Sequence, residues 1–142
     1  MGEAADVMRR KMAAFNAQDA KGLQEIFTAD CQVEVPGASL RGPEHVVAFF
    51  SVFWEAFPDL HCEITQVVEE ASVVAIQAMT TGTHLATLHT PGGDIPLTGK
   101  RVDLPIADVY EVEGGLITAS HLYFDRLALL ERLGVAAAPV AA

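Results

Sequence analysis

The sequence predicts an α+β domain in which helices come first and a mostly antiparallel sheet follows. Apolar residues recur at helical spacing in the first part of the chain, and from residue 60 onward the apolar period changes to two. The length of 142 residues suits one domain that buries roughly two thirds of its unfolded surface. Because the helices precede the strands instead of alternating with them, the pattern argues against a doubly wound parallel sheet.

The first part of the chain contains three predicted helices and one short strand. Residues 3–16 carry apolar side chains at helical spacing: Val7, Met8, Met12 and Phe15. Asp19 can cap a second short helix through residues 23–27. Residues 32–35 alternate as a short strand that ends at Pro36-Gly37. Pro43 then begins a third helix with a wide aromatic face, which stops before Pro58.

The second part predicts a sheet and a last helix. Four strands are expected in two hairpins, over residues 60–69, 73–83, 102–112 and 116–124. The proline- and glycine-rich residues 85–99 are expected to form a loop beside the sheet, and Asp125 to cap a helix over 126–133. The tail over 136–142 has no period and is expected to be flexible, so the single domain should span residues 1–135.

Composition excludes several classes of function. Nine basic residues stand against nineteen acidic ones, for a net charge of −10, so no cationic surface is expected for nucleic acid or an anionic membrane. No apolar run approaches the ~20 residues that span a bilayer, and we expect no signal peptide, because no charged-then-apolar stretch opens the sequence. Cys31 and Cys62 are expected to be small core residues in a reducing cytoplasm.

The sequence also lacks the motifs of metal and nucleotide enzymes. The five histidines show no metal-ligand spacing, and there is no GxSxG, P-loop or GxGxxG motif. We therefore expect neither a metal nor an organic cofactor.

Asp108 is the most informative residue for chemistry. Within the predicted strand 102–112 it is the only acidic or basic residue on the face that carries Val102, Leu104, Ile106, Tyr110 and Val112. An isolated carboxyl group among apolar neighbours either finds polar partners or has its pKa raised, because burial disfavours the charged form. Such a group can act as a general acid or base, or it can be a satisfied core aspartate.

The partner of Asp108 depends on the register of the hairpin at Gly114-Gly115. A two- or four-residue loop places Asp108 opposite His121, which would allow a proton relay between them. A three-residue loop places Asp108 opposite Ser120 and turns His121 to the other face. Both registers remain possible from the sequence, and Asp108 and His121 are the candidate catalytic residues.

A pocket is expected between the early helices and the curved sheet, because bulky aromatic side chains cannot seal a strongly curved surface. His84, at a strand end, could reach the mouth of this pocket. The expected lining residues are Phe15, Phe50, Phe53, Trp54, His84, Tyr110 and Leu122. The aromatic residues could equally be ordinary core.

Four stretches carry a resemblance to a known family. They are TGTH (81–84), PLTGKRV (96–102), EGGLI (113–117) and the ending YFDxxxLLxxLG (123–134). With the order of the elements, they resemble the SnoaL-like polyketide cyclases of the nuclear-transport-factor-2-like superfamily. The resemblance covers roughly residues 5–134 and implies a cone-shaped α+β fold around an apolar pocket. It is specific for the fold and weak for the reaction.

The resemblance implies a cofactor-free, aldol-type ring closure on a small apolar carbonyl compound such as a polyketide. The carboxylate base of the cyclases falls on Leu122, so the base has moved to Asp108 or His121, or this chain does not perform that closure. Epoxide-hydrolase relatives also need an acidic residue where Leu122 stands. The alternatives are a non-catalytic module that binds a small molecule or serves in assembly, and an epoxide-hydrolase-like enzyme.

A homodimer is also expected. The outer face of the sheet is predicted to carry Val67 and Val109, with His121 and Tyr123 joining it in one register. A two-fold interface is the commonest way to bury such a surface, and the resemblance also implies dimers.

Overall fold

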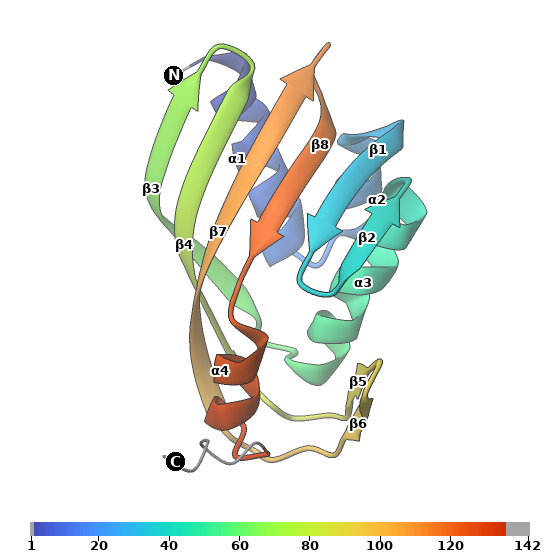
Figure 1. Cartoon of the computed structure of the whole chain (residues 1–142), viewed down its shortest axis with the longest axis vertical. Coiled ribbons are helices and arrows are strands. Elements are labelled where there is room, and N and C mark those ends of the chain that lie inside the picture. Colours follow the sequence, from blue (N-terminus) through green and yellow to red (C-terminus); the bar gives the residue numbers. More distant parts are fainter. Residues whose placement is uncertain (1, 136–142) are drawn as a thin grey trace, which may run out of the picture.

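The computed structural model describes residues 2–135, and the predicted tail over 136–142 lies outside the described residues. Figure 1 shows the arrangement of four helices and eight strands. The helices are α1 (Glu3–Asn16), α2 (Ala20–Glu25), α3 (Pro43–Ala56) and α4 (Arg126–Arg132). The strands are β1 (Phe27–Val35), β2 (Ala38–Arg41), β3 (His61–Glu70), β4 (Val73–Thr83), β5 (Leu88–Thr90), β6 (Gly93–Ile95), β7 (Arg101–Glu113) and β8 (Leu116–Tyr123).

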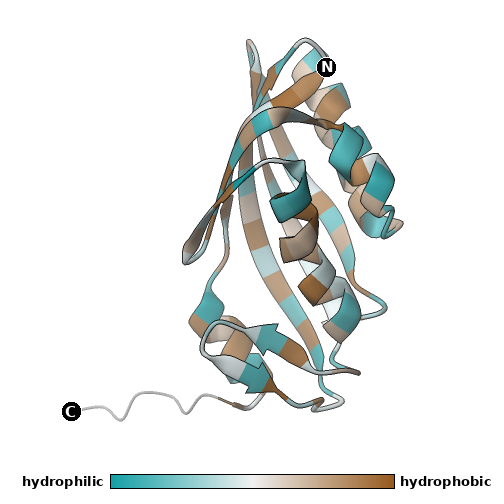
Figure 2. Ribbon diagram, turned by 90° about the vertical axis from the view of Figure 1, so that its right-hand side faces the viewer, coloured by the Kyte–Doolittle hydropathy of each residue, from teal (hydrophilic) through white to brown (hydrophobic). Residues whose placement is uncertain are grey.

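Six strands form one curved sheet in the order β2-β1-β8-β7-β4-β3, and β5 pairs with β6 in a separate hairpin. Every neighbouring pair in the large sheet is antiparallel except β1 and β8, which run parallel. Helices α1 and α3 lie on the same side of this sheet, as the turned view in Figure 2 shows. The α+β prediction, with helices packed on a mostly antiparallel sheet, is confirmed.

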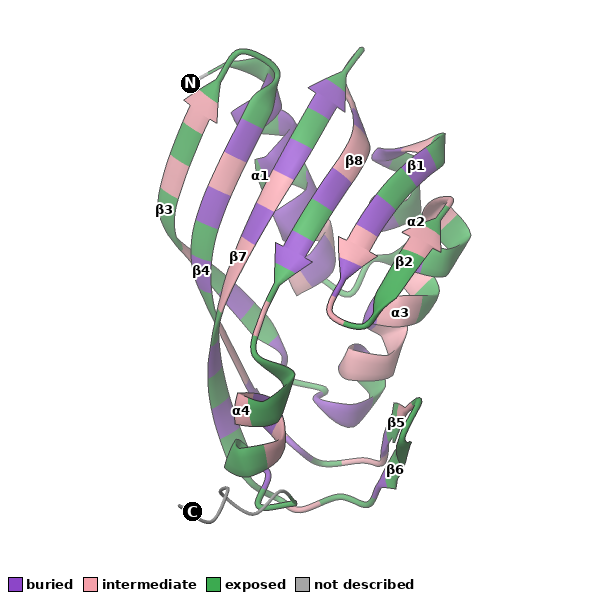
Figure 3. Ribbon diagram, in the orientation of Figure 1, coloured by how far each residue is buried: buried purple, intermediate pink, exposed green. Residues whose placement is uncertain are grey.

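Burial alternates along the strands, as Figure 3 shows most clearly on β4, β7 and β8. The even-numbered residues of β7 from Val102 to Val112 point toward the helices and form much of the inner face. Helix α1 buries the matching apolar stripe that begins at Ala4 and ends at Phe15. The alternation in the sequence thus decides which face of the sheet carries the core.

Both predicted helix caps are present. The carboxylate of Asp19 accepts a hydrogen bond from the Gly22 N–H at 2.9 Å. The carboxylate of Asp125 accepts one from the Ala128 N–H at 3.0 Å. Each cap satisfies a backbone donor that the first turn of a helix leaves free.

Three local predictions were incomplete. Helix α2 ends at Glu25, and Phe27 already begins β1, which is longer than the predicted strand 32–35. Strand β2 and the β5–β6 hairpin were not predicted. The Ile26 carbonyl accepts a hydrogen bond from the Ile117 N–H at 2.8 Å, so pairing with β8, distant in sequence, draws this segment into the sheet. Tertiary pairing of this kind overrides local propensity.

Neither predicted register of the β7–β8 hairpin holds at Asp108, although the two-residue loop is correct at the turn itself. The turn is the two-residue Gly114-Gly115, with Glu113 opposite Leu116, but a bulge at Thr118 shifts the pairing by one residue. Asp108 therefore lies opposite Leu122, and His121 lies opposite Val109 on the other face. One extra residue in one strand changes every later partner.

The prediction that Val67 lies on the outer face of the sheet was wrong, because a second bulge precedes it. The pairing of β3 with β4 shifts between Ile64 and Gln66, so Val67 lies opposite the buried Ile76. Val67 therefore packs against the core, and the next residue, Val68, takes its place on the outer face with 56% of its surface exposed. The sequence pattern alone contains no sign of this extra residue.

Candidate functional site

A largely apolar pocket of about 80 Å³ lies between α1, α3 and the inner face of the sheet. This space is several times what one water molecule needs. Its lining comes from both helices, the sheet, the segment before β3 and the last helix: Lys11, Met12, Phe15, Phe49, Phe50, Phe53, Phe57, Leu60, Cys62, Thr80, Val102, Leu104, Ile106, Asp108, Leu122, Phe124 and Leu129. The prediction of an apolar pocket between helices and sheet agrees with this geometry.

Asp108 is the one carboxyl group among these lining residues, and only 2% of its surface is exposed. Strand β7 directs it inward, between Ile106 and Tyr110 on the same face. Its Oδ1 atom is buried without a hydrogen-bond partner among the described residues. A buried oxygen of this kind is costly unless something binds it, so it is available to a ligand.

Lys11 places a positive charge beside Asp108. Its Nζ lies 3.7 Å from Asp108 Oδ2 and donates a hydrogen bond to the Tyr110 hydroxyl at 3.0 Å. Three aromatic rings surround the ammonium, with centroids at 5.0 Å for Phe50, 5.2 Å for Tyr110 and 5.6 Å for Phe15. Ring faces attract a cation, so these three rings offset part of the cost of burying the ammonium, and only 4% of Lys11 is exposed.

Burial and the neighbouring polar groups have opposite effects on the acidity of Asp108. Burial raises the pKa of Asp108 to about 6, while the Lys11 ammonium and the Tyr110 hydroxyl both lower it. Burial is the larger effect. The pKa of Tyr110 is raised, by burial first and by the nearby Asp108 carboxylate second, so this hydroxyl keeps its proton. At pH 7 Asp108 is mostly ionised and can still accept a proton, as a general base requires.

Cys62 lines the pocket near this trio. Burial raises the pKa of its thiol, and a hydrogen bond from the Thr80 hydroxyl opposes that rise. The thiol therefore stays protonated at neutral pH, which makes it a poor nucleophile.

The structure brings some of the predicted site residues together and separates others. Phe15, Phe50, Phe53 and Leu122 line the pocket with Asp108. Trp54 and Tyr110 lie behind it: Trp54 packs on Phe15 with ring centroids 5.9 Å apart, and Tyr110 is fully buried under Lys11.

His84 is buried outside the pocket lining. The Thr98 backbone N–H donates to its Nδ1 at 3.1 Å, and its ring lies 5.3 Å from the Phe57 ring. Burial lowers the pKa of His84, so the ring is neutral and ties the β4–β7 connection to the core. This position corrects the expectation that His84 reaches the pocket mouth.

His121 lies on the outer face of the sheet, away from Asp108. Its ring stacks on Tyr123 at 6.5 Å between centroids, and both side chains are exposed. The proposed Asp108–His121 proton relay is therefore absent, because the bulge at Thr118 turns His121 outward.

Lys11 is the residue of the candidate site that the sequence analysis missed. It follows Val7 by four residues and precedes Phe15 by four, so it lies on the apolar stripe of α1. A charged residue at such a position signals a buried partner in the same way as Asp108 does on β7. The signal is easily overlooked because Lys11 follows Arg9 and Arg10, and three consecutive basic residues suggest a solvent-exposed run.

The described residues also bear on metal binding and on membrane crossing. Within residues 2–135, no group of three or more His, Cys, Asp or Glu side chains is placed to hold a metal ion. In the same range, no helix has both the length and the apolar character needed to cross a membrane.

Solved structures of known proteins share this fold. A protein from Jannaschia sp. CCS1 described as a SnoaL-like polyketide cyclase is 23% identical, with a TM-score of 0.82 over 95% of this chain and 94% of the other. IdmH from Streptomyces antibioticus, described as a polyketide cyclase, is 22% identical, with a TM-score of 0.77 over 94% and 100%. A Catenulispora acidiphila protein with a ketosteroid isomerase-like fold, in complex with trimethylamine, is 20% identical, with a TM-score of 0.75 over 92% and 93%.

The sequence comparison identifies the family directly. No curated protein matches the chain. The family described as SnoaL-like domain matches residues 8–120, which is most of the sequence. With its curved sheet, its packed helices and these structural neighbours, the chain belongs to the SnoaL-like domain family and has the nuclear-transport-factor-2-like fold.

Proposed function

We propose that this protein is a cofactor-free acid–base enzyme that acts on a small apolar carbonyl compound, in a cyclisation or isomerisation. The observation that carries the proposal is the buried Asp108 carboxylate at the wall of an apolar pocket, with one oxygen that no residue in the described part of the chain hydrogen-bonds. Two structural neighbours described as polyketide cyclases favour a polyketide among the possible substrates.

The proposed reaction begins with proton transfer to Asp108. The carboxylate removes a proton from the carbon next to the substrate carbonyl, and the electron pair of that C–H bond becomes an enolate. The enolate carbon then attacks a second carbonyl of the same molecule, in a ring closure, or accepts a proton at another position, in an isomerisation. In either case Asp108 returns its proton, so the enzyme is unchanged.

The test compares wild type with Asp108→Asn on linear and pre-cyclised aromatic polyketide esters and a ketosteroid. Turnover is followed by chromatography, and exchange of the acidic C–H protons in D₂O by NMR. We expect Asp108→Asn to lower both by about 10²–10⁴-fold, since a placed base contributes about that much.

Asp103→Asn is the matched control. Asp103 lies on the same strand but is exposed, and its ion pair with Arg132 spans 3.7 Å at the surface, so its loss should leave turnover unchanged. If no compound turns over or exchanges protons, and ligand binding is indifferent to Asp108→Asn, the catalytic proposal fails.

In that case the alternative of a non-catalytic binding module stands, since the same pocket can hold an apolar ligand. The epoxide-hydrolase alternative has less support. The residue directly opposite Asp108 is Leu122, so this pair of positions supplies one carboxylate and not two.

We also propose a cytoplasmic homodimer. Cys31 and Cys62 are both buried free thiols, which suits a reducing compartment. A row of apolar side chains crosses the outer face of the sheet from Val68 through Ala75 to Val109. Tyr123, beside this row, is 58% exposed. A second copy of the chain would cover this surface.

A further inference from the structure

We infer that Lys11 is the group that binds the substrate's carbonyl oxygen and stabilises the enolate, so that Lys11 and Asp108 act as a pair. The inference deepens the proposed function and rests on it. It also narrows the ligand to a compound that presents an oxygen acceptor beside an acidic C–H group and is otherwise largely apolar.

The first observation is the hydrogen-bonding capacity of the ammonium. Lys11 Nζ has three N–H donors, and among the described residues only the Tyr110 hydroxyl accepts a hydrogen bond from it. Asp108 Oδ2, at 3.7 Å, is too distant for a hydrogen bond. Aromatic rings lie around the ammonium and attract its charge, but they do not replace an oxygen acceptor for the donors that remain.

The second observation is that the free donor and the free acceptor lie together. Asp108 Oδ1 has no hydrogen-bond partner within residues 2–135, and Lys11 lies within ion-pair distance of the same carboxylate. Nearly all other lining residues are apolar or aromatic. A ligand that satisfies both groups must therefore present its polar atoms at one point, with an acceptor for Lys11 and a proton for Asp108.

The third argument is the balance of charge. Before proton transfer, the pocket holds the Lys11 ammonium and the Asp108 carboxylate. After transfer, Asp108 is neutral and the negative charge is on the enolate oxygen, still beside Lys11. The low-dielectric pocket therefore never holds an unbalanced charge, and a fixed ammonium stabilises the charge where it develops.

A phenolate tests this inference because it resembles an enolate in charge and geometry but undergoes no reaction. We would measure the binding of 4-nitrophenol, whose ionised form is yellow, to wild type, Asp108→Asn, Lys11→Met and the control Lys21→Met. Asp108→Asn imitates the protonated aspartate of the intermediate. Lys21 is exposed on α2 and is not among the residues that line the pocket.

We expect Asp108→Asn to bind the phenolate at least as tightly as wild type, and to shift the bound phenol toward its ionised form. Lys11→Met should weaken phenolate binding by ~10–100-fold, the range of a hydrogen bond to a charged group. It should leave the binding of uncharged nitrobenzene unchanged, which also reports that the pocket is folded. Lys21→Met should behave as wild type.

Equal phenolate affinity in wild type and Lys11→Met would overturn the inference. Should Lys11→Met fail to fold, the Asp108→Asn variant decides alone: a bound phenol that remains neutral, at a pH where it is neutral in water, also overturns it. Phenolate binding that depends on Lys11, without turnover or proton exchange of any carbonyl compound in wild type, would support the role of Lys11 as an anion-binding group and refute the proposed reaction.

Discussion

Asp108 is subject to two opposing influences, burial and a neighbouring positive charge. Burial brings its pKa to about 6, and the Lys11 ammonium prevents a larger rise. The residue can therefore change protonation state within the physiological range, which few carboxyl groups do.

A pH profile follows from this value. If Asp108 is the base, kcat/KM should rise with pH and level off above about 6, since only the carboxylate accepts a proton. In Lys11→Met the midpoint should move to higher pH, because the cation that lowers the pKa is gone. The same midpoint in wild type and Lys11→Met would contradict the coupling of Lys11 and Asp108. Lys21→Met is the control for the loss of a lysine outside the pocket.

At the scale of the elements, the bulge at Thr118 decides what faces the pocket. It places Leu122 opposite Asp108 and sends His121 to the outer face. The Thr118 hydroxyl donates a hydrogen bond to the Glu111 carbonyl at 3.2 Å, so the extra residue is bonded across the hairpin at this point. The Asp108 carboxylate is consequently paired with a lysine on a helix and not with a histidine on the neighbouring strand.

The variant Leu122→Asp tests this cross-strand geometry. Two carboxyl groups on opposite residues disfavour each other's ionisation, so the pKa values of the pair should rise further above those of the unfolded chain. A carboxyl group with a raised pKa favours the folded state below its unfolded pKa, and that contribution is lost as pH rises through the folded pKa.

We therefore expect Leu122→Asp to be close to the uncharged control Leu122→Asn in its free energy of unfolding at pH 4, and clearly less stable than that control at pH 8. Urea denaturation at the two pH values measures the difference. An equal difference at both pH values would mean that residues 108 and 122 do not face each other.

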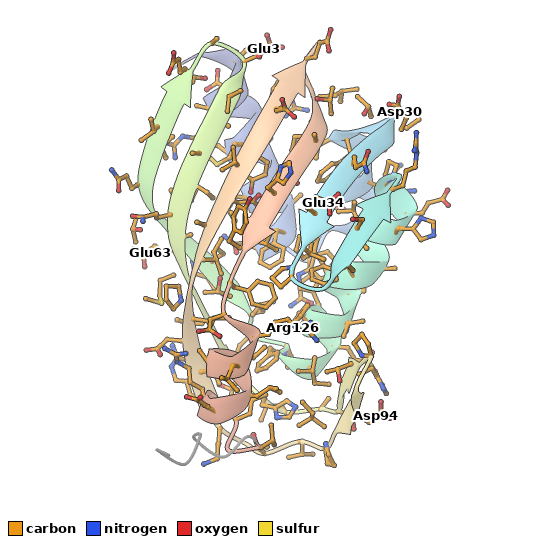
Figure 4. The ribbon with its side chains drawn as sticks, viewed as in Figure 1. Glu3, Asp30, Glu34, Glu63, Asp94 and Arg126 are labelled. Atoms are coloured by element: carbon orange, nitrogen blue, oxygen red, sulfur yellow. The ribbon has the colours of Figure 1, made fainter. Side chains whose placement is uncertain are left out.

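At the scale of the whole molecule, the acidic surface and the apolar outer face have opposite effects on association. The net charge is −10, and acidic side chains such as Glu3, Asp30, Glu63 and Asp94 stand at the periphery (Figure 4). Like charges repel two copies, while burial of the row from Val68 to Val109 favours their association.

The proposed dimer should therefore become tighter as salt is added. Raising the salt from about 0.01 M to about 1 M shortens the Debye length from about 30 Å to about 3 Å and screens the repulsion. Light scattering should show a larger dimer fraction in high salt, and Val109→Glu should abolish the dimer. Gln24→Glu, which adds the same charge on the exposed side of α2, should not. A wild-type monomer at high micromolar concentration in both conditions would refute the dimer.

Much of the fold could be predicted from the sequence because local sequence patterns determine the secondary structure. The change from helical to alternating spacing near residue 60 predicted the α+β class, and the Asp19 and Asp125 caps located two helix starts. Asp108 stood out because it interrupts an apolar strand face, and its burial is confirmed. In each case the physical cause acts between residues close in the chain.

Only the tertiary structure decided which groups meet Asp108. The bulge at Thr65 turns Val67 toward the core, and the bulge at Thr118 turns His121 toward the outer face. A bulge depends on how a strand pairs with its neighbour, and a local sequence pattern does not contain that information. Lys11 reaches Asp108 across 97 positions of sequence because α1 packs on β7. The sequence by itself therefore determined the class of fold and the buried carboxyl group, and packing between distant elements determined that its partner is a lysine within a cage of aromatic rings.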